Sequence, residues 1–190
     1  MSYTKFSTGI AKYLSQEIDL NQEQETVIAY SLDNILLGIT GFVLIVFVGA
    51  LFGAALPAAI TALAGGILRR FSGGVHASTP LKCMIFSSLG YGLASVLGFH
   101  LSQRITLTTV SFILPLIFSL VVVSLYAPVD STAKPIHDHN LKKRLKLGSI
   151  FFVLLMLVLV ISLESNINKV SLTLGVLIQS CTLFPVFNAR

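Results

Sequence analysis

The run ILLGITGFVLIVFVGALF, residues 35–52, decides the fold class of this chain, because none of its 18 side chains is charged. A helix of about 20 apolar residues crosses the roughly 30 Å of hydrocarbon in a bilayer. Five more apolar stretches follow it: Ala54–Leu68, Leu81–Leu101, Ile105–Tyr126, Leu147–Leu163 and Val170–Phe187. The sequence therefore predicts an all-α fold, a polytopic membrane helical bundle of about six transmembrane segments.

The composition of the whole chain also favours a membrane protein. Of its 190 residues, 54% are hydrophobic and 11% are charged, whereas an ordinary soluble domain has roughly 25% charged residues. The mean hydropathy is +0.86. Residues 1–34 are polar and lack the early apolar segment of a signal peptide. We therefore expect residues 1–34 to form a cytoplasmic N-terminal segment and residues 35–190 to form a single transmembrane domain, whose first span directs the chain to the membrane.

The second apolar stretch is short for a full crossing. Two spans joined by a turn need about 40 residues or more, and residues 35–68 supply only 34. The second span is therefore short, re-entrant, or completed by the segment Phe71–Val75. We favour the last alternative, which brings His76 close to the bilayer and leaves Arg69 and Arg70 to snorkel or to pair.

The distribution of lysine and arginine predicts the orientation. With six spans, one side of the membrane carries eleven of the thirteen basic residues, whereas the other side carries Arg104 and Lys169. The larger set comprises Lys5, Lys12, Arg69, Arg70, Lys82, Lys134, Lys142, Lys143, Arg144, Lys146 and Arg190. Because basic loops stay in the cytoplasm, both termini and the loops at 69–82 and 127–146 should be cytoplasmic. An odd number of spans would lose this asymmetry.

The N-terminal segment carries apolar residues at nearly helical spacing, namely Phe6, Ile10, Tyr13, Leu14 and Ile18. This pattern is typical of an amphipathic helix that lies on the inner leaflet of the membrane. A loosely folded polar lead-in is the alternative, and the sequence leaves both open.

The segment Arg69–Cys83, RRFSGGVHASTPLKC, gathers the residues that could carry out chemistry. Thr79 followed by Pro80 is typical of a helix N-cap and first helical position, so the third span should begin there. The two adjacent glycines allow the preceding chain to turn, and His76 can then fold back onto the first helical turn. On one continuous helix, by contrast, about 10 Å would separate His76 from Cys83.

Cys83 would then lie near a helix N-terminus, beside Lys82 and within reach of the His76 imidazole, and each of these favours the thiolate. A free thiol with a pKa of about 8.5 is only about 3% ionised at pH 7. A dyad with Cys83 as nucleophile and His76 as general base and acid is therefore physically sound. The alternative is a chance neighbourhood of the two side chains. Cys181, inside an apolar stretch, is predicted to be a buried small side chain, and no disulfide framework is indicated.

The loop at 127–146 holds two further polar groups. The sequence His137-Asp138-His139 could bind a metal, but a solvated loop is the simpler interpretation, and we expect no metal or other cofactor. The basic run Lys142–Lys146 either orients the loop or docks an acidic peptide or anionic lipid headgroups, and both can hold together. It lacks the aromatic or Gly-rich setting used to bind bases, so no nucleic acid partner is expected for this chain of net charge +5.

Two motifs, taken in order, resemble the AgrB family of bacterial quorum-sensing peptidases. The first is the Gly-Gly-x-His-Ala sequence followed by Cys83 seven positions after His76. The second is Tyr126-Ala-Pro, followed by Lys134-Pro-Ile and a basic run. The length, the polar lead-in and the six apolar stretches are also similar to that family, so the resemblance covers nearly the whole chain.

The resemblance implies a membrane-embedded cysteine endopeptidase in the cell membrane of a Gram-positive bacterium. Such enzymes cleave the C-terminal tail from a small propeptide, AgrD, and help to close its thiolactone or lactone ring. The family's catalytic residues fall on His76 and Cys83, and no cofactor is implied. Residues that match the surrounding motif or the basic loop are candidate substrate contacts: Arg69, Arg70, Gly74, Lys134, Lys142, Lys143 and Arg144. We expect the partners to be an AgrD-like propeptide, the lipid bilayer and a second copy of the chain in a homodimer.

Two other functions remain open from the residues alone. A small transporter or exporter is compatible with six spans and their glycines, although the spans carry no interior acidic or basic residue to mark an ion path. A noncatalytic scaffold whose basic loops bind a partner is the third possibility. A third catalytic residue is not assignable, and backbone N–H groups at the start of the third span are candidates for an oxyanion hole.

Overall fold

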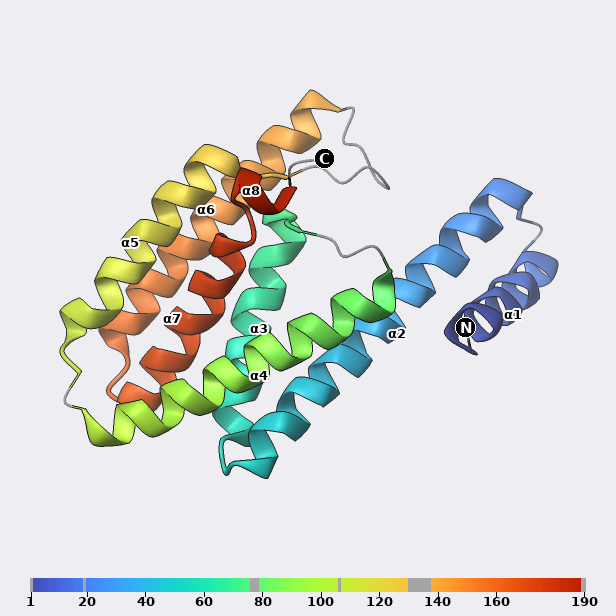
Figure 1. The fold of residues 1–190 in the computed structure, drawn as a ribbon. Coiled ribbons are helices and arrows are strands. Elements are labelled where there is room, and N and C mark those ends of the chain that lie inside the picture. The colour runs from blue at the N-terminus through green and yellow to red at the C-terminus, as the bar shows by residue number, and fades with distance from the viewer. Residues whose placement is uncertain (1, 19, 76–78, 106, 130–137, 189–190) are drawn as a thin grey trace. The chain divides into compact units, whose positions relative to one another are not determined.

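The computed structural model describes residues 2–18, 20–75, 79–105, 107–129 and 138–188, and in these ranges the chain is all-helical (Figure 1). The helices are α1 (Ser2–Glu17), α2 (Gln22–Leu51), α3 (Ala55–Ser72), α4 (Pro80–Arg104), α5 (Thr109–Tyr126), α6 (His139–Ser162), α7 (Asn166–Cys181) and α8 (Pro185–Asn188). The described ranges contain no strand, only an isolated parallel bridge between Gly73 and Val129. The predicted all-α fold is confirmed.

The chain divides into two compact units, residues 1–43 and residues 44–190. In the first unit, α1 lies beside the first part of α2, and the Ser7 hydroxyl donates a hydrogen bond of 2.6 Å to Asp33 Oδ1. Phe6 and Tyr13 on α1 are exposed, as the apolar face of an interfacial helix would be. The predicted N-terminal helix is confirmed, and its position on the bilayer surface stays a prediction. Helix α2 continues without a break through residues 34 and 35.

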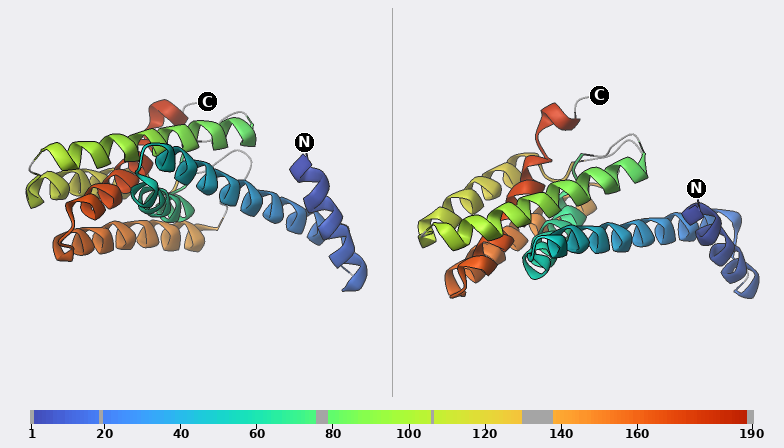
Figure 2. Two further views of the ribbon diagram at one scale, coloured as in Figure 1. Left: turned by 90° about the horizontal axis from the view of Figure 1, so that it is seen from below. Right: turned by 60° about the horizontal axis from the view of Figure 1, so that its bottom comes forward.

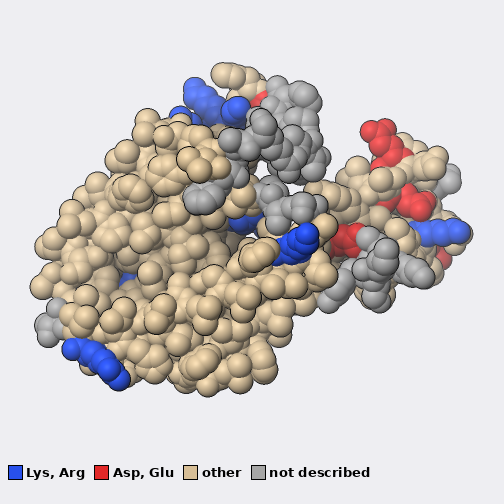
Figure 3. All heavy atoms as spheres, viewed as in Figure 1, with Lys and Arg blue, Asp and Glu red and all other residues tan. Residues whose placement is uncertain are grey.

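Helices form at all six predicted apolar stretches. Four of the described helices, α2, α4, α5 and α6, are long and apolar enough to cross a bilayer. In Figure 3 the face in view of the larger unit is mostly uncharged, with few lysine and arginine side chains. Large apolar side chains such as Phe86 and Phe151 are about 70% exposed, which suits contact with lipid rather than water. The chain is a multi-pass membrane protein.

Helices α3 and α7 form the inner pair of the larger unit. Helix α7 contacts α3, α4, α5 and α6, and Figures 1 and 2 show it among them. Eight of the 16 residues of α7 and eight of the 18 of α3 are buried, against six of 25 in α4. Their shared surface is built from small residues, because a Cβ on Gly175 would meet the Thr61 carbonyl oxygen and would lie 2.9 Å from the Ala64 Cβ. Small residues let membrane helices approach closely.

Several helix ends differ from the predicted spans. Helix α6 begins at His139, eight residues before Leu147, because a basic segment outside the hydrocarbon can still form helical turns. Helix α7 ends at Cys181, and the chain turns before Pro185. Helix α3 includes Phe71 and Ser72 of the predicted completing segment Phe71–Val75, but it ends there because Gly73 adopts φ +67°. A full crossing of the bilayer by α3 stays a prediction.

Candidate active site

Cys83 lies in the first turns of α4, where the sequence predicts a helix start. Thr79 is the N-cap, its side chain accepts a 3.3 Å hydrogen bond from the Lys82 amide, and Pro80 occupies the first helical position. The amide of Cys83 donates to the Thr79 carbonyl at 3.0 Å. The predicted cap is confirmed. Two amides of this turn, those of Lys82 and Cys83, are therefore already bonded to Thr79. Fewer backbone N–H groups of the turn are then left to bind an oxyanion.

Arg69 connects the end of α3 to this turn. Its Nη2 donates a 2.6 Å hydrogen bond to the Val75 carbonyl and lies 3.8 Å from the Cys83 Sγ. Reactive cysteines in proteins commonly have a cationic side chain beside the sulfur. Arg70, the next residue, is exposed. His76 lies outside the described residues, and the chain is described up to Val75 on one side and from Thr79 on the other.

The two sequence motifs meet at the glycine pair. The Val129 amide, which follows Tyr126-Ala-Pro, donates a 2.9 Å hydrogen bond to the Ser72 carbonyl. A side chain on Gly73 would collide with the Val129 carbonyl oxygen. Gly74 has φ +137°, and a Cβ there would lie 2.6 Å from the Thr182 Oγ1. Both glycines are required by backbone conformation and by close approach, and the segments at 72–74 and 126–129 therefore lie together at one end of the bundle.

Sequence reasoning missed Gln179, which lies beneath the glycine pair. It is completely buried on α7. Its Nε2 donates to the Gly73 carbonyl at 2.7 Å and to the Ser72 hydroxyl at 3.2 Å. Its Oε1 accepts a 3.3 Å hydrogen bond from the Tyr91 hydroxyl on α4. A lone glutamine in an apolar stretch was the available signal, since polar side chains inside membrane bundles bond across helices.

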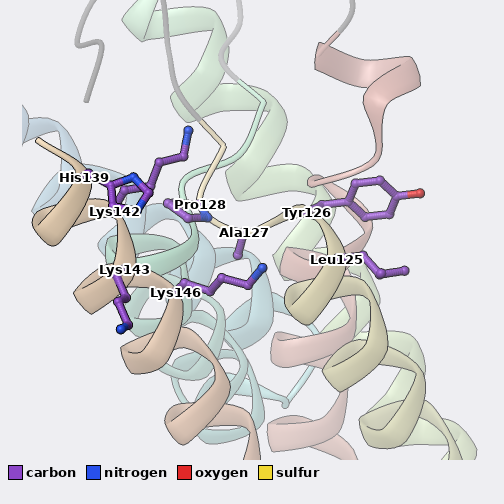
Figure 4. Close-up of a pocket in the computed structure, with 8 residues that line it drawn as sticks. All are labelled: Leu125, Tyr126, Ala127, Pro128, His139, Lys142, Lys143 and Lys146. Carbon is purple, nitrogen blue, oxygen red and sulfur yellow. The ribbon is translucent and has the colours of Figure 1, made fainter. Parts of the chain in front are cut away.

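A basic pocket of about 420 Å³ opens between the end of α5 and the start of α6. It is lined by Leu125, Tyr126, Ala127, Pro128, His139, Lys142, Lys143 and Lys146. Figure 4 shows Lys146 extending from α6 toward the end of α5, whereas Lys143 projects away from it. Of the predicted substrate contacts, Lys142 and Lys143 line this pocket, Arg144 is exposed outside it, and Lys134 lies outside the described residues.

Cys181 is only partly buried, so the prediction of a buried side chain is wrong. The reason is its position at the last residue of α7, where the helix leaves the bundle core. Cys83 is also partly buried, and neither cysteine forms a disulfide. The described residues hold no group of three or more His, Cys, Asp or Glu side chains that could bind a metal.

Comparison with known proteins decides the family. The family described as Accessory gene regulator B, AgrB, matches residues 7–183 of this chain. The chain belongs to the AgrB family. AgrB proteins belong to accessory gene regulator quorum-sensing systems, so membership assigns this membrane protein to bacterial cell-to-cell signalling.

Each of the relatives below matches over most of this chain and over most of its own length. A putative AgrB-like protein of Clostridium perfringens (strain SM101 / Type A) is 29% identical over 94% of this chain and 90% of its own. Accessory gene regulator protein B of Staphylococcus epidermidis is 25% identical over 93% of this chain and 88% of its own. A putative AgrB-like protein of Listeria monocytogenes is 26% identical over 87% of this chain and 79% of its own. No solved structure matches the chain.

Proposed function

We propose that this AgrB-family chain is a membrane-embedded cysteine endopeptidase that cleaves the C-terminal tail from an AgrD-like propeptide. In this proposal Cys83 is the nucleophile and His76 is the general base and acid. The enzyme also promotes closure of the thiolactone or lactone ring of the signal peptide. The active site faces the cytoplasm, in keeping with the excess of lysine and arginine on that side.

The observation that carries the proposal is the surroundings of Cys83. Its sulfur lies 3.8 Å from the Arg69 guanidinium, in a helix start capped by Thr79. A cation and a helix N-terminus both lower the free energy of the thiolate, which is the nucleophilic form of cysteine. Cys181 lies instead at the C-terminal end of α7, where the helix dipole disfavours an anion.

The reaction follows from thioester chemistry. The Cys83 sulfur attacks the scissile carbonyl carbon, the C–N bond breaks, and the tail's new amine takes its proton from His76. The remaining peptide is then a thioester on Cys83. A cysteine or serine of the propeptide attacks this carbonyl, a proton passes to His76, and the Cys83 thiolate leaves as the ring closes. Because thioester exchanges for thiolactone with little loss of acyl activation, no nucleotide is required.

Water is the competitor for the thioester. A site at the edge of the bilayer excludes water and so favours ring closure over hydrolysis. The basic pocket beside Pro128 contributes the substrate contacts in this proposal, through Lys142 and Lys143. Lysine ammonium groups attract carboxylates, so an acidic part of the propeptide is the expected occupant. Arg70, Gly74, Lys134 and Arg144 complete the proposed set of residues near the substrate.

The proposal is tested by co-expressing the chain with an AgrD-like propeptide and following the products by mass spectrometry. Wild-type protein and Cys181→Ala should both yield the free tail and the cyclic peptide. Cys83→Ala and His76→Ala should each yield neither, at unchanged protein levels. Tail release that survives Cys83→Ala would refute the peptidase assignment. Peptide export that survives it would favour the transporter.

A further inference from the structure

The buried amide of Gln179 joins α7 and α4 to the segment that precedes His76. We propose that Gln179 is a positioning residue that holds Gly73–Val75 in register with Cys83. This role rests on the proposed peptidase function, and it concerns a residue on α7, whereas Cys83 lies on α4.

The hydrogen bonds of Gln179 account for both protons of its amide nitrogen and for its oxygen. Nε2 donates to the Gly73 carbonyl at 2.7 Å and to the Ser72 hydroxyl at 3.2 Å, and Oε1 accepts from Tyr91 at 3.3 Å. The side chain is completely buried. A buried polar group loses more free energy when its partner is removed than it gains when the bond forms. These hydrogen bonds therefore attach α7 to the C-terminal end of α3, at Ser72 and Gly73.

This attachment reaches Cys83 through Arg69. Two residues after Gly73, the Val75 carbonyl accepts the 2.6 Å hydrogen bond from Arg69 Nη2, and the same nitrogen lies 3.8 Å from the Cys83 Sγ. Val75 is also the residue directly before His76. Any displacement of the Gly73 peptide therefore moves the carbonyl that orients the guanidinium.

The packing at Gly74 also brings the segment Gly73–Val75 into contact with the end of α7. A Cβ at Gly74 would lie 3.1 Å from Gln179 Nε2 and 2.6 Å from Thr182 Oγ1. The segment thus passes directly against the end of α7, with no space for a side chain between them. A residue that only stabilised the bundle would affect unfolding, whereas a positioning residue must also affect the reactivity of Cys83.

The experiment uses the full chain in a Cys181→Ser background and compares Gln179→Met with Ser180→Ala. Met keeps the length of the side chain and removes all three hydrogen bonds. Ser180 is a matched control, because it is buried on the same helix and its hydroxyl donates to the Val176 carbonyl of that helix. Three readouts are taken: propeptide cleavage, iodoacetamide alkylation of Cys83 against pH, and deuterium exchange at the Val129 amide.

For Gln179→Met, kcat should fall about tenfold or more with KM little changed, since the reacting groups and not the substrate contacts are displaced. The pH profile of alkylation should move upward by about one unit, which lowers the rate about tenfold at pH values well below the pKa of the thiol. The Val129 amide should exchange about tenfold faster, because its acceptor on Ser72 is no longer held. Ser180→Ala should match the parent protein in all three.

A folded Gln179→Met protein with the parent's kcat and alkylation profile would overturn the positioning role and leave the peptidase proposal intact. If the parent protein does not cleave a propeptide, the peptidase proposal fails, and the alkylation and exchange data still decide the role of Gln179. If Gln179→Met does not fold, Ser72→Ala replaces it. That variant removes one of the two acceptors, so a smaller shift in the same direction supports the role and no shift overturns it.

Discussion

Arg69→Gln should make Cys83 a much poorer nucleophile near neutral pH. The perturbation removes the positive charge 3.8 Å from the sulfur and leaves a shorter, neutral amide side chain. Two unit charges at about 4 Å interact by about 1 kcal/mol in water and about 4 kcal/mol at an effective dielectric constant of about 20. Because Cys83 is partly buried, the loss should fall between these values. It corresponds to an upward move of the alkylation profile by about one to three pH units.

The assay is the rate of iodoacetamide alkylation of Cys83, measured by mass spectrometry from pH 6 to pH 10 in a Cys181→Ser background. Arg70→Gln is the matched control, since it removes the same charge from the next residue, which is exposed. Screening by water and salt should keep its effect below about threefold in rate. At pH values well below the pKa of the thiol, the alkylation rate of Arg69→Gln should fall about tenfold or more relative to the parent protein. Equal profiles for the two variants would refute the assignment of Arg69 to the thiolate.

Three further predictions concern the glycines and the basic pocket. Gly74→Ala should lower kcat about tenfold or more, because φ +137° is strained for alanine and its Cβ would lie 2.6 Å from a side-chain oxygen at the end of α7. A wild-type kcat would contradict the close approach. Gly175→Ala should destabilise the bundle by about 1–3 kcal/mol through overpacking against α3, whereas Gly66→Ala, with nothing within 4 Å, should not; thermal unfolding in detergent compares them, and equal midpoints would refute the packing. Replacing Lys142 and Lys143 with Gln should raise KM about threefold to tenfold with kcat unchanged, since exposed ion pairs contribute up to about 1 kcal/mol each; an unchanged KM would remove the pocket from the substrate path.

The sequence predicted the fold well wherever composition alone decides it. Apolar stretches of helical length must satisfy their backbone groups internally in a bilayer, so each of the six became a helix. The N-cap at Thr79 was also predictable, because a hydroxyl followed by proline is a local signal. Helix α6 begins before the predicted stretch, which started at Leu147. The low hydropathy of Lys142–Lys146 indicates where the hydrocarbon ends, and the helix continues beyond that point.

The contacts between distant segments could not be read from a sequence. The bridge between Gly73 and Val129 depends on how α3 and α5 end beside each other, and no spacing along the chain encodes it. Gln179 lies more than a hundred residues from Gly73, and the hydrogen bond between them is visible only in the folded chain. Arg69 was predicted as a substrate contact from its place in a motif, and the motif did not indicate that its guanidinium lies 3.8 Å from the Cys83 sulfur.

The central claim, that Cys83 carries the peptide as a thioester, is tested most directly by the intact mass of the protein during turnover. The propeptide should carry alanine in place of its ring-forming cysteine or serine, so that ring closure is blocked and the acyl-enzyme accumulates. We expect an added mass equal to the N-terminal part of the propeptide, attached at Cys83, released by neutral hydroxylamine and absent from Cys83→Ala. Release of the tail without any adduct on Cys83, or with an adduct on another residue, would contradict it.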